Sequence, residues 1–245
     1  KDTIPAGDYY ISGVKISNNS IKAIWYGIVL TNAKNVKVTS NQLQCNPIAD
    51  GYGIYLTQRS TKCTVTGNTI TKFSGSGIYI DEGSSAKSVS ENTIKSVGAY
   101  GIVVDATAVD KILSNTVTNA GNKGIVAYNN AMVGRIEKNV VKTCSGYGIT
   151  VGSVKKDVSI KSNIVTRCEG NQVYVNTDTT KRLVTISKNT LKGTVEGSGI
   201  RVDSGKIKVA SNKIDTCGVG VYLYTGVKGT IDKNTYKKIS MYPIY

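Results

Sequence analysis

Apolar and polar residues alternate along most of this chain in short stretches with a period of two. This alternation predicts half-buried β-strands, and no stretch has the 3.6-residue period of an amphipathic helix. Gly, Asn, Ser and Lys separate the stretches, and these residues favour turns. The pattern therefore predicts a protein that is nearly all β.

The alternating stretches belong to a repeat. An Asn followed two residues later by an apolar residue recurs ten times, at intervals of 22 to 27 residues, and a β-branched aliphatic residue stands three positions before each Asn. The ten asparagines are Asn19, Asn41, Asn68, Asn92, Asn115, Asn139, Asn163, Asn189, Asn212 and Asn234. Repeats this short cannot each enclose a core, but stacked coils can surround one continuous apolar column. We predict a single right-handed parallel β-helix domain over residues 1–245, with about ten coils and three short strands per coil.

The repeated Asn has a structural explanation. In stacked coils the amides can hydrogen-bond to one another and to the turn backbone, and Asn tolerates the dihedral angles of tight turns. We therefore expect an asparagine ladder. Cys144, Cys168 and Cys217 lie five residues after their Asn, so we expect them to fill the core. The same slot is held elsewhere by Ile24, Phe73, Val97, Ala120 and Ile239.

The composition excludes several kinds of catalytic and metal-binding site. The chain has no His, which excludes a Ser-His-Asp triad, a His-ligated zinc and a His general base. Its 31 Lys and Arg exceed its 16 Asp and Glu, a net charge of +15 that suits an acidic polymer. Clustered Arg with aromatic stacking platforms, which nucleic acid would require, is missing, and no apolar run is long enough to span a membrane. We expect neither a nucleic-acid partner nor membrane insertion.

A second strand signal, Gly followed by Ile or Val, comes after most of the asparagines. If this Gly is position zero, a period of two turns positions zero, two and four outward. Tyrosines there suit sugars, because an aromatic face meets the C–H side of a sugar ring. The Gly is expected to lower one flank of this surface and let a chain-like ligand approach the backbone. Position two is held by Val29, Tyr55, Tyr79, Val103, Val126, Thr150, Tyr174, Arg201 and Tyr222.

Charged residues on this surface form two groups. Asp81 and Asp105 hold equivalent positions on consecutive coils, with Glu82 adjacent and Arg59 in the preceding turn. Carboxylates about one strand spacing apart can bind Ca²⁺ or share a proton, so Asp81, Glu82 and Asp105 are candidate calcium ligands. Asp81, Asp105 and Arg59 are candidate catalytic residues. The alternative is that they are ordinary turn residues balanced by the abundant Lys.

The second group lies about four coils further along. It contains Arg201, Asp203 and Tyr222, which combine a cation, a carboxylate and an aromatic ring. Together with the outward tyrosines of other coils, these residues are the candidate substrate-binding set. That set is Tyr55, Tyr79, Tyr174, Arg201, Asp203 and Tyr222.

Several segments resemble the coils of the pectate-lyase-like right-handed β-helix superfamily. They are Tyr52-Gly53-Ile54-Tyr55-Leu56, Gly77-Ile78-Tyr79-Ile80-Asp81 and Val65-Thr66-Gly67-Asn68-Thr69-Ile70, and the opening Ile4 to Ile11 resembles an entry strand. The resemblance implies a carbohydrate ligand. The Asp-Pro-His of alginate epimerases never follows the Tyr-Gly-Ile sequences here, and the Gly-His-Gly of polygalacturonases is missing, which argues against both activities.

We therefore expect an extracellular or cell-surface module that binds polysaccharide, acidic polymers included, along its tyrosine-bearing strand face. One alternative is a polysaccharide lyase that cleaves uronate polymers by β-elimination, with Asp81, Glu82 and Asp105 as its acidic group and Arg59 or Arg201 as its cation. Another is a non-catalytic structural spacer of a surface protein. The expected cofactor is none, or calcium. The nearly regular spacing, with one short extra loop at residues 46–50, indicates that no deep cleft forms.

The chain begins at Lys1 without a Met, so we expect a piece excised from a larger protein with adjoining domains. A solenoid exposes strand edges and core at both ends unless it is capped. We expect Tyr9, Tyr10 and Ile11 to close one end and residues 241–245 to cover the other only in part. This favours neighbouring sequence or an end-to-end contact in concentrated solution.

Overall fold

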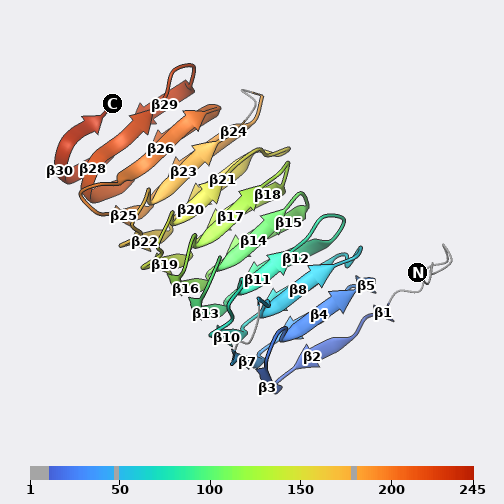
Figure 1. The fold of residues 1–245 in the computed structure, drawn as a ribbon. Coiled ribbons are helices and arrows are strands. Elements are labelled where there is room, and N and C mark those ends of the chain that lie inside the picture. The colour runs from blue at the N-terminus through green and yellow to red at the C-terminus, as the bar shows by residue number, and fades with distance from the viewer. Residues whose placement is uncertain (1–10, 47–49, 178–180) are drawn as a thin grey trace.

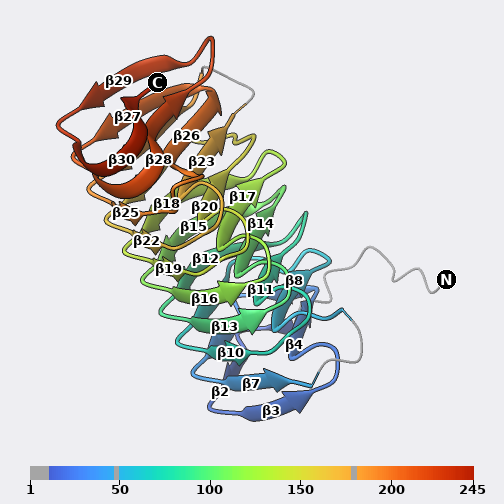
Figure 2. The same ribbon diagram turned by 60° about the vertical axis from the view of Figure 1, so that its left-hand side comes forward.

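The computed structural model describes residues 11–46, 50–177 and 181–245. The regular elements of these residues are all β-strands, from β1 to β30. Figures 1 and 2 show them wound into coils that stack from the blue N-terminal end to the red C-terminal end. The predicted parallel β-helix is confirmed, since every pairing between strands is parallel and links one coil to the next.

The first column of strands carries the aliphatic residue that precedes each Asn by three positions. It forms a sheet of ten strands. These are β2 (Lys15–Ser17), β6 (Lys37–Thr39), β9 (Cys63–Thr66), β12 (Ser85–Ser90), β15 (Ala108–Leu113), β18 (Met132–Glu137), β21 (Val158–Lys161), β24 (Leu183–Ser187), β27 (Lys206–Ala210) and β29 (Lys228–Asp232).

The second column begins directly after each Asn. It consists of β3 (Ser20–Ala23), β7 (Gln42–Cys45), β10 (Thr69–Thr71), β13 (Thr93–Val97), β16 (Thr116–Ala120), β19 (Val140–Lys142), β22 (Ile164–Thr166), β25 (Thr190–Lys192), β28 (Lys213–Leu223) and β30 (Thr235–Ile244). Its strands β28 and β30 are long because they run on into the third column.

The third column begins after the repeated Gly and carries the candidate site. Its separate strands are β4 (Ile28–Thr31), β8 (Ile54–Thr57), β11 (Ile78–Ile80), β14 (Ile102–Asp105), β17 (Ile125–Tyr128), β20 (Ile149–Val151), β23 (Val173–Asn176) and β26 (Ser198–Ser204). A further short pair, β1 (Ile11–Ser12) and β5 (Ala33–Lys34), lies near the N-terminal end.

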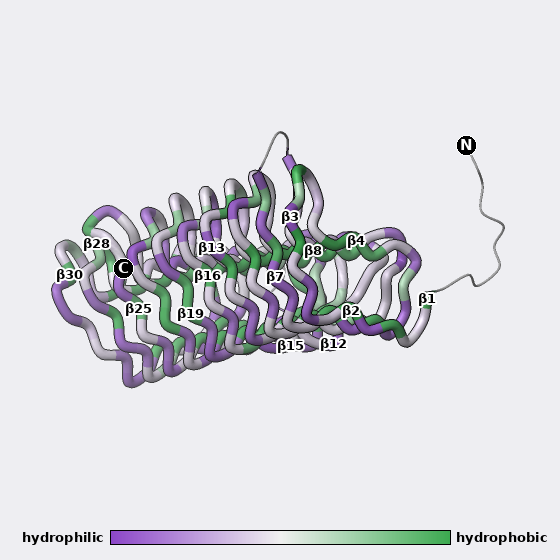
Figure 3. The backbone as a smooth tube through the Cα atoms, turned by 90° about the horizontal axis from the view of Figure 1, so that it is seen from below, coloured by the Kyte–Doolittle hydropathy of each residue, from purple (hydrophilic) through white to green (hydrophobic). Residues whose placement is uncertain are grey.

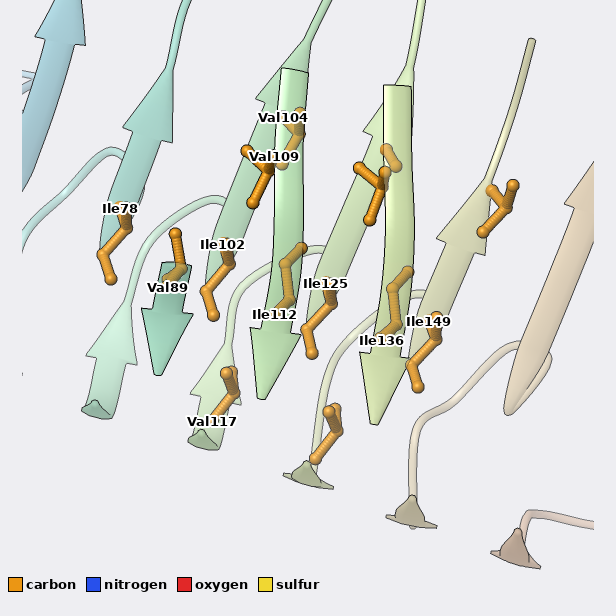
Figure 4. Packing of buried hydrophobic residues seen from close by; sticks show 14 of the residues in the cluster. Ile78, Val89, Ile102, Val104, Val109, Ile112, Val117, Ile125, Ile136 and Ile149 are labelled. Atoms are coloured by element: carbon orange, nitrogen blue, oxygen red, sulfur yellow. The ribbon is translucent and has the colours of Figure 1, made fainter. Parts of the chain in front are cut away.

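Aliphatic side chains fill the interior in rows that run along the helix axis. Figure 4 shows Ile78, Ile102, Ile125 and Ile149 in one such row, contributed by four successive coils. All four are fully buried. Figure 3 shows the matching alternation of hydrophobic and hydrophilic segments along the coils. Burial of this apolar column is what stabilises the stack, because no single coil has an interior of its own.

The asparagine ladder is confirmed and is directional. Asn68 donates to Asn92 Oδ1 from both its backbone N–H and its Nδ2, each at 3.0 Å. Asn92 in turn donates to Asn115 Oδ1 in the same way, at 3.0 and 2.9 Å. Each Oδ1 therefore accepts from the coil before it, and each Asn donates to the coil after it.

The strained residue of this turn is the one before the Asn, not the Asn itself. Glu91, Ser114 and Lys138 have left-handed φ values of 58°, 55° and 55°. The expectation that the ladder Asn itself adopts the unusual dihedral angles was therefore wrong. The Asn amide instead satisfies the backbone next to a residue held in that conformation.

The core role expected for Cys144, Cys168 and Cys217 is confirmed, and Cys45 and Cys63 are likewise buried and unpaired. One member of their slot was assigned wrongly. Ile24 is 57% exposed, whereas Ala23 packs against the core and pairs with Cys45 of the next coil. The first two coils therefore keep strict alternation at this corner, whereas in most later coils the residue four positions after the Asn has a left-handed φ, 61° at Lys72, and the residue after it turns inward.

Ile11 is exposed, while Tyr9, Tyr10 and most of the entry segment lie outside the described residues, as does the centre of the loop at 46–50. The described residues contain no helix with the length and apolar character that a membrane span requires.

Candidate functional site

The candidate site is the outer surface of the third column, which we call the tyrosine face. Its side chains come from the positions two and four residues after the repeated Gly, together with the residue just before that Gly. Alternation along each strand turns these side chains away from the core. Val103 and Val126 show this directly, because both are buried yet neither belongs to the interior cluster that holds their neighbours Ile102 and Ile125.

Four tyrosine rings pack together on the first three coils of this face. Tyr52 and Tyr79 stack with centroids 4.9 Å apart and an interplanar angle of 16°. Tyr26 and Tyr55 stack at 6.1 Å and 19°, and Tyr55 meets Tyr79 edge to face at 5.7 Å. We call these four residues the tyrosine cluster. Such offset and edge-to-face contacts are favourable and fix the orientation of the rings.

Sequence reasoning missed half of this cluster. It selected Tyr55 and Tyr79 from the position two residues after Gly but not Tyr26 and Tyr52, which precede the Gly. The signal is present in the sequence, because the repeated Tyr-Gly-Ile places a Tyr directly before the Gly in several coils. The bend at the Gly turns the preceding side chain onto the same face as the later ones.

Tyrosine hydroxyls bond to aspartates of the following coil at three places. Tyr55 donates to Asp81 Oδ2 at 2.7 Å, and Tyr79 donates to Asp105 Oδ2 at 2.6 Å. The register explains this, since Tyr55 pairs with Tyr79 and Asp81 lies two residues further along the same face. The tyrosine therefore reaches diagonally across the two strands. Tyr174 makes the third such bond, to Asp203 Oδ2 at 2.8 Å.

Asp105 is the most heavily bonded of these carboxylates. Besides Tyr79, it accepts from the Tyr128 hydroxyl at 3.0 Å and from Asn129 Nδ2 at 2.9 Å. Burial, and then the bond to Asp105, raises the pKa of Tyr79. Burial also raises the pKa of Tyr128 to about 12, and the neighbouring Asp105 carboxylate adds to this effect. These two phenols are therefore neutral donors to a carboxylate at physiological pH.

The structure brings Asp81 and Asp105 to neighbouring strands, as predicted. Asp81 accepts hydrogen bonds from Tyr55, from Thr57 at 3.4 Å and from the Glu82 backbone N–H at 2.8 Å. Glu82 is an exposed turn residue. Over residues 11–46, 50–177 and 181–245, no three His, Cys, Asp or Glu side chains group in a way that could hold a metal ion.

Arg59, the cation proposed for the same patch, is an exposed turn residue with a left-handed φ of 65°. Within the described part of the chain it forms no ion pair with Asp81 or Asp105. The ion pairs found there instead join Arg201 to Asp203 and Lys233 to Asp232.

The second predicted group is brought together. Arg201 Nε donates to Asp203 Oδ1 at 2.7 Å, which raises the pKa of Arg201, and the guanidinium lies over the Tyr222 ring at 5.0 Å. Tyr222 also stacks on Tyr245 at 5.0 Å. With Tyr174 bonded to the other oxygen of Asp203, one carboxylate anchors a cation and one aromatic side chain, and that cation covers the ring of Tyr222.

Between these two groups, the side chains two residues after the Gly are buried. Val103, Val126 and Thr150 are only 0%, 4% and 4% exposed, although their side chains point outward. The face between the two groups is therefore formed by the partly exposed Tyr100, Tyr128 and Tyr147, and the Tyr147 ring lies 4.9 Å from the Tyr174 ring. The small residues of the middle coils lie beneath their larger neighbours, which alternation alone does not predict.

The repeated Gly does not lower a flank of this surface, so that expectation was wrong. A Cβ on Gly77 would lie 2.5 Å from Ile94 Cγ2 and 2.8 Å from the Gly101 carbonyl oxygen. Ile94 is a core residue, so the missing side chain faces the interior at the corner between the second and third columns. Gly is required there because the corner leaves no room for a Cβ.

Comparison with family models decides the classification. The model of the right-handed β-helix region matches three overlapping stretches, residues 5–110, 46–191 and 100–245. The chain belongs to the right-handed β-helix family. This membership agrees with the resemblance to the pectate-lyase-like superfamily and assigns the coil its hand. No curated protein matches the chain.

Proposed function

We propose that this right-handed β-helix binds polysaccharide along its tyrosine face and does not act on it chemically. The observation that carries the proposal is the tyrosine cluster. Its rings come from three successive coils, contact one another, and include two whose hydroxyls are fixed by Asp81 and Asp105. A rigid aromatic surface loses little conformational entropy when a sugar chain lies on it.

Charge favours an acidic polymer as the ligand. The net charge of +15 attracts polyanions over a distance set by ionic strength. Cations also stand next to the rings: Lys123 lies 5.4 Å from the Tyr147 ring centroid, and Arg201 lies over Tyr222. A uronate chain could contact the rings through its C–H faces and these cations through its carboxylates. Such a role fits an extracellular or surface-attached module, which is part of the proposal.

The lyase alternative gains no specific support from the geometry. Asp81 and Asp105 already accept hydrogen bonds from tyrosines, and Arg59 is not paired with either carboxylate. A base and a charge-neutralising group would need to converge on one sugar to eliminate across its C4–C5 bond.

Affinity electrophoresis in gels that contain polygalacturonate, alginate or a neutral glucan tests the proposal. We expect retardation by at least one acidic polymer, with weaker retardation at high salt. Tyr26→Ala should reduce the retardation, because Tyr26 is 41% exposed within the tyrosine cluster. Trp25→Ala is the matched control, since Trp25 is an exposed neighbour that makes no ring contact with the tyrosine cluster.

Equal mobility in all gels would contradict binding and favour the spacer. Absorbance of an unsaturated uronate product, measured on the same polymers with added Ca²⁺, provides the second readout. A rise that Asp105→Ala abolishes would contradict the non-catalytic part of the proposal.

A further inference from the structure

The two ends of the solenoid differ in which hydrogen-bonding group of the Asn ladder has no ladder partner among the described residues. At the C-terminal end, Asn234 Oδ1 accepts from Asn212, but among the described residues no next Oδ1 is present for the Asn234 backbone N–H. At the N-terminal end, Asn19 donates to Asn41, and no described residue donates to Asn19 Oδ1. One end therefore offers donors and the other end offers the matching acceptor.

The strands of the first and last coils also have one unpaired edge each, and the two sets of edges face in opposite directions along the axis. In the described part of the chain, β29 and β30 pair only with the coil before them, and β2, β3 and β4 pair only with the coil after them. Unpaired edges of this kind are templates for further strands. Because all pairings along the rod are parallel, the edge at one end has the polarity needed to continue from the edge at the other.

Large apolar side chains are exposed at both ends. The first coil exposes Ile24, Trp25, Tyr26 and Val29, and the last exposes Tyr242, Ile244 and Tyr245. The interior is also less covered there, since Ile16 and Ile21 at one end and Ile231 and Tyr236 at the other are only partly buried. Each end thus presents both backbone groups and apolar surface that could be covered together.

We propose that the C-terminal end of one molecule docks on the N-terminal end of a second copy, head to tail, and continues the β-helix. The register within the chain fixes the contact. With Asn234 of one copy donating to Asn19 of the next, Ile231 lies opposite Ile16 and Tyr236 lies opposite Ile21, as in the pairs Val209–Ile231 and Ile214–Tyr236 within one chain. In the third column Ile244 lies opposite Ile28. Apolar residues meet apolar residues in every inward column.

A second copy is the occupant that these features select. A contact between two C-terminal ends would place donor against donor, and a contact between two N-terminal ends would place acceptor against acceptor. Neither could continue a parallel ladder. A head-to-tail contact uses two different surfaces, so it does not close into a dimer and instead allows linear growth.

The same register opposes growth by charge. Lys237 of one copy lies opposite Lys22 of the next, in the outward position three residues after the Asn. Within the chain this column mostly avoids such a clash: Lys22 pairs with Gln44, and Lys237 pairs with Asp215. Together with the net charge, the Lys22–Lys237 contact should make assembly weak at low salt and stronger as salt screens the repulsion.

Sedimentation velocity over a range of protein and salt concentrations tests the proposal. We expect weight-average mass to rise with both, through elongated species. Lys22→Glu should strengthen association about two- to fivefold at low salt, because it places a carboxylate opposite Lys237. The control is Lys95→Glu, which makes the same charge change in the same column of an interior coil, where Lys95 pairs with Thr71 and Thr118.

The double variant Lys22→Glu with Lys237→Glu should lose the gain of the single variant, since two like charges again face each other. Circular dichroism checks that each variant is folded. A single monomeric species at every salt and protein concentration would overturn the proposal. So would equal effects of Lys22→Glu and Lys95→Glu, because association would then depend on net charge alone or on another surface.

Discussion

The Tyr79 hydroxyl donates a hydrogen bond of 2.6 Å to Asp105 on the next coil. The bond joins side chains on the outside of the solenoid, where the Asn ladder and the core do not reach. Asp105 also binds Tyr128 and Asn129, so residues from three consecutive coils are tied together on the tyrosine face. The outer surface is therefore organised by contacts between coils, as the interior is.

These half-buried phenols predict a loss of stability at high pH. The pKa of Tyr128 is raised from 10.0 to about 12, and that of Tyr79 is raised as well. The unfolded chain releases these protons near pH 10 while the folded chain keeps them. The contribution of these two groups to the free energy of unfolding should therefore be complete below pH 10 and should fall as pH rises from about 10 toward 12.

Urea unfolding at pH 9 and pH 11 measures this effect. The wild type should lose more stability between the two pH values than the double variant Tyr79→Phe with Tyr128→Phe, which lacks both protons. Identical losses in the two proteins would show that the phenols are not linked to folding.

The Asn ladder predicts a difference between its middle and its end. Asn115→Ala leaves the backbone N–H and one Nδ2 hydrogen of Asn92 buried without an acceptor, and removes the bonds from Asn115 Nδ2 to Asn139 Oδ1 and to the Val89 carbonyl oxygen. We expect a loss of about 1–3 kcal/mol in the free energy of unfolding. Asn19→Ala should cost less, because no described residue donates to the exposed Asn19. Denaturant titration compares the two, and equal losses would contradict a cooperative ladder.

Two buried threonines should respond in opposite directions to the same substitution. Thr150 Oγ1 has no hydrogen-bond partner among the described residues, so Thr150→Val removes a desolvated polar atom and should stabilise the protein by about 1 kcal/mol. Thr107 Oγ1 donates to the Ser84 carbonyl oxygen, so Thr107→Val should destabilise it by about 1–3 kcal/mol. Thermal unfolding of both variants is the measurement. Destabilisation by Thr150→Val would indicate that its hydroxyl has a partner.

The repeated Gly predicts a local packing failure. Gly77→Ala places a Cβ against Ile94 and the Gly101 carbonyl oxygen, and should cost about 1–3 kcal/mol. Gly134→Ala is the control, because its nearest neighbours lie at 3.1 Å or more and include the flexible end of Lys156. Its loss should be well under that of Gly77→Ala, and a comparable loss would argue that general backbone effects dominate.

The coil architecture follows from the sequence alone. A period of two, an aliphatic residue three positions before each Asn and an interval of 22 to 27 residues leave few ways to bury the apolar positions other than stacking coils. The ladder and the buried cysteines follow from the same repeat. The expectation for Ile24 was wrong because the first two coils keep strict alternation at this corner and turn Ala23 and Cys45 inward, whereas most later coils have a left-handed residue there that moves the inward position by one.

The arrangement of the tyrosine face could be predicted only in part from the sequence. Alternation turned Tyr55, Tyr79 and Asp105 outward, but it could not tell which tyrosine meets which aspartate, because those partners lie 26 residues apart and diagonal to one another. Nor could it show that Val103 and Thr150 are covered, or that the Gly faces the core. The repeat, the strands and the inward columns depend on local alternation, so they can be predicted from the order of residues. The contacts on the outer face depend on how far each side chain reaches across the next coil, so they emerge only when the coils are stacked.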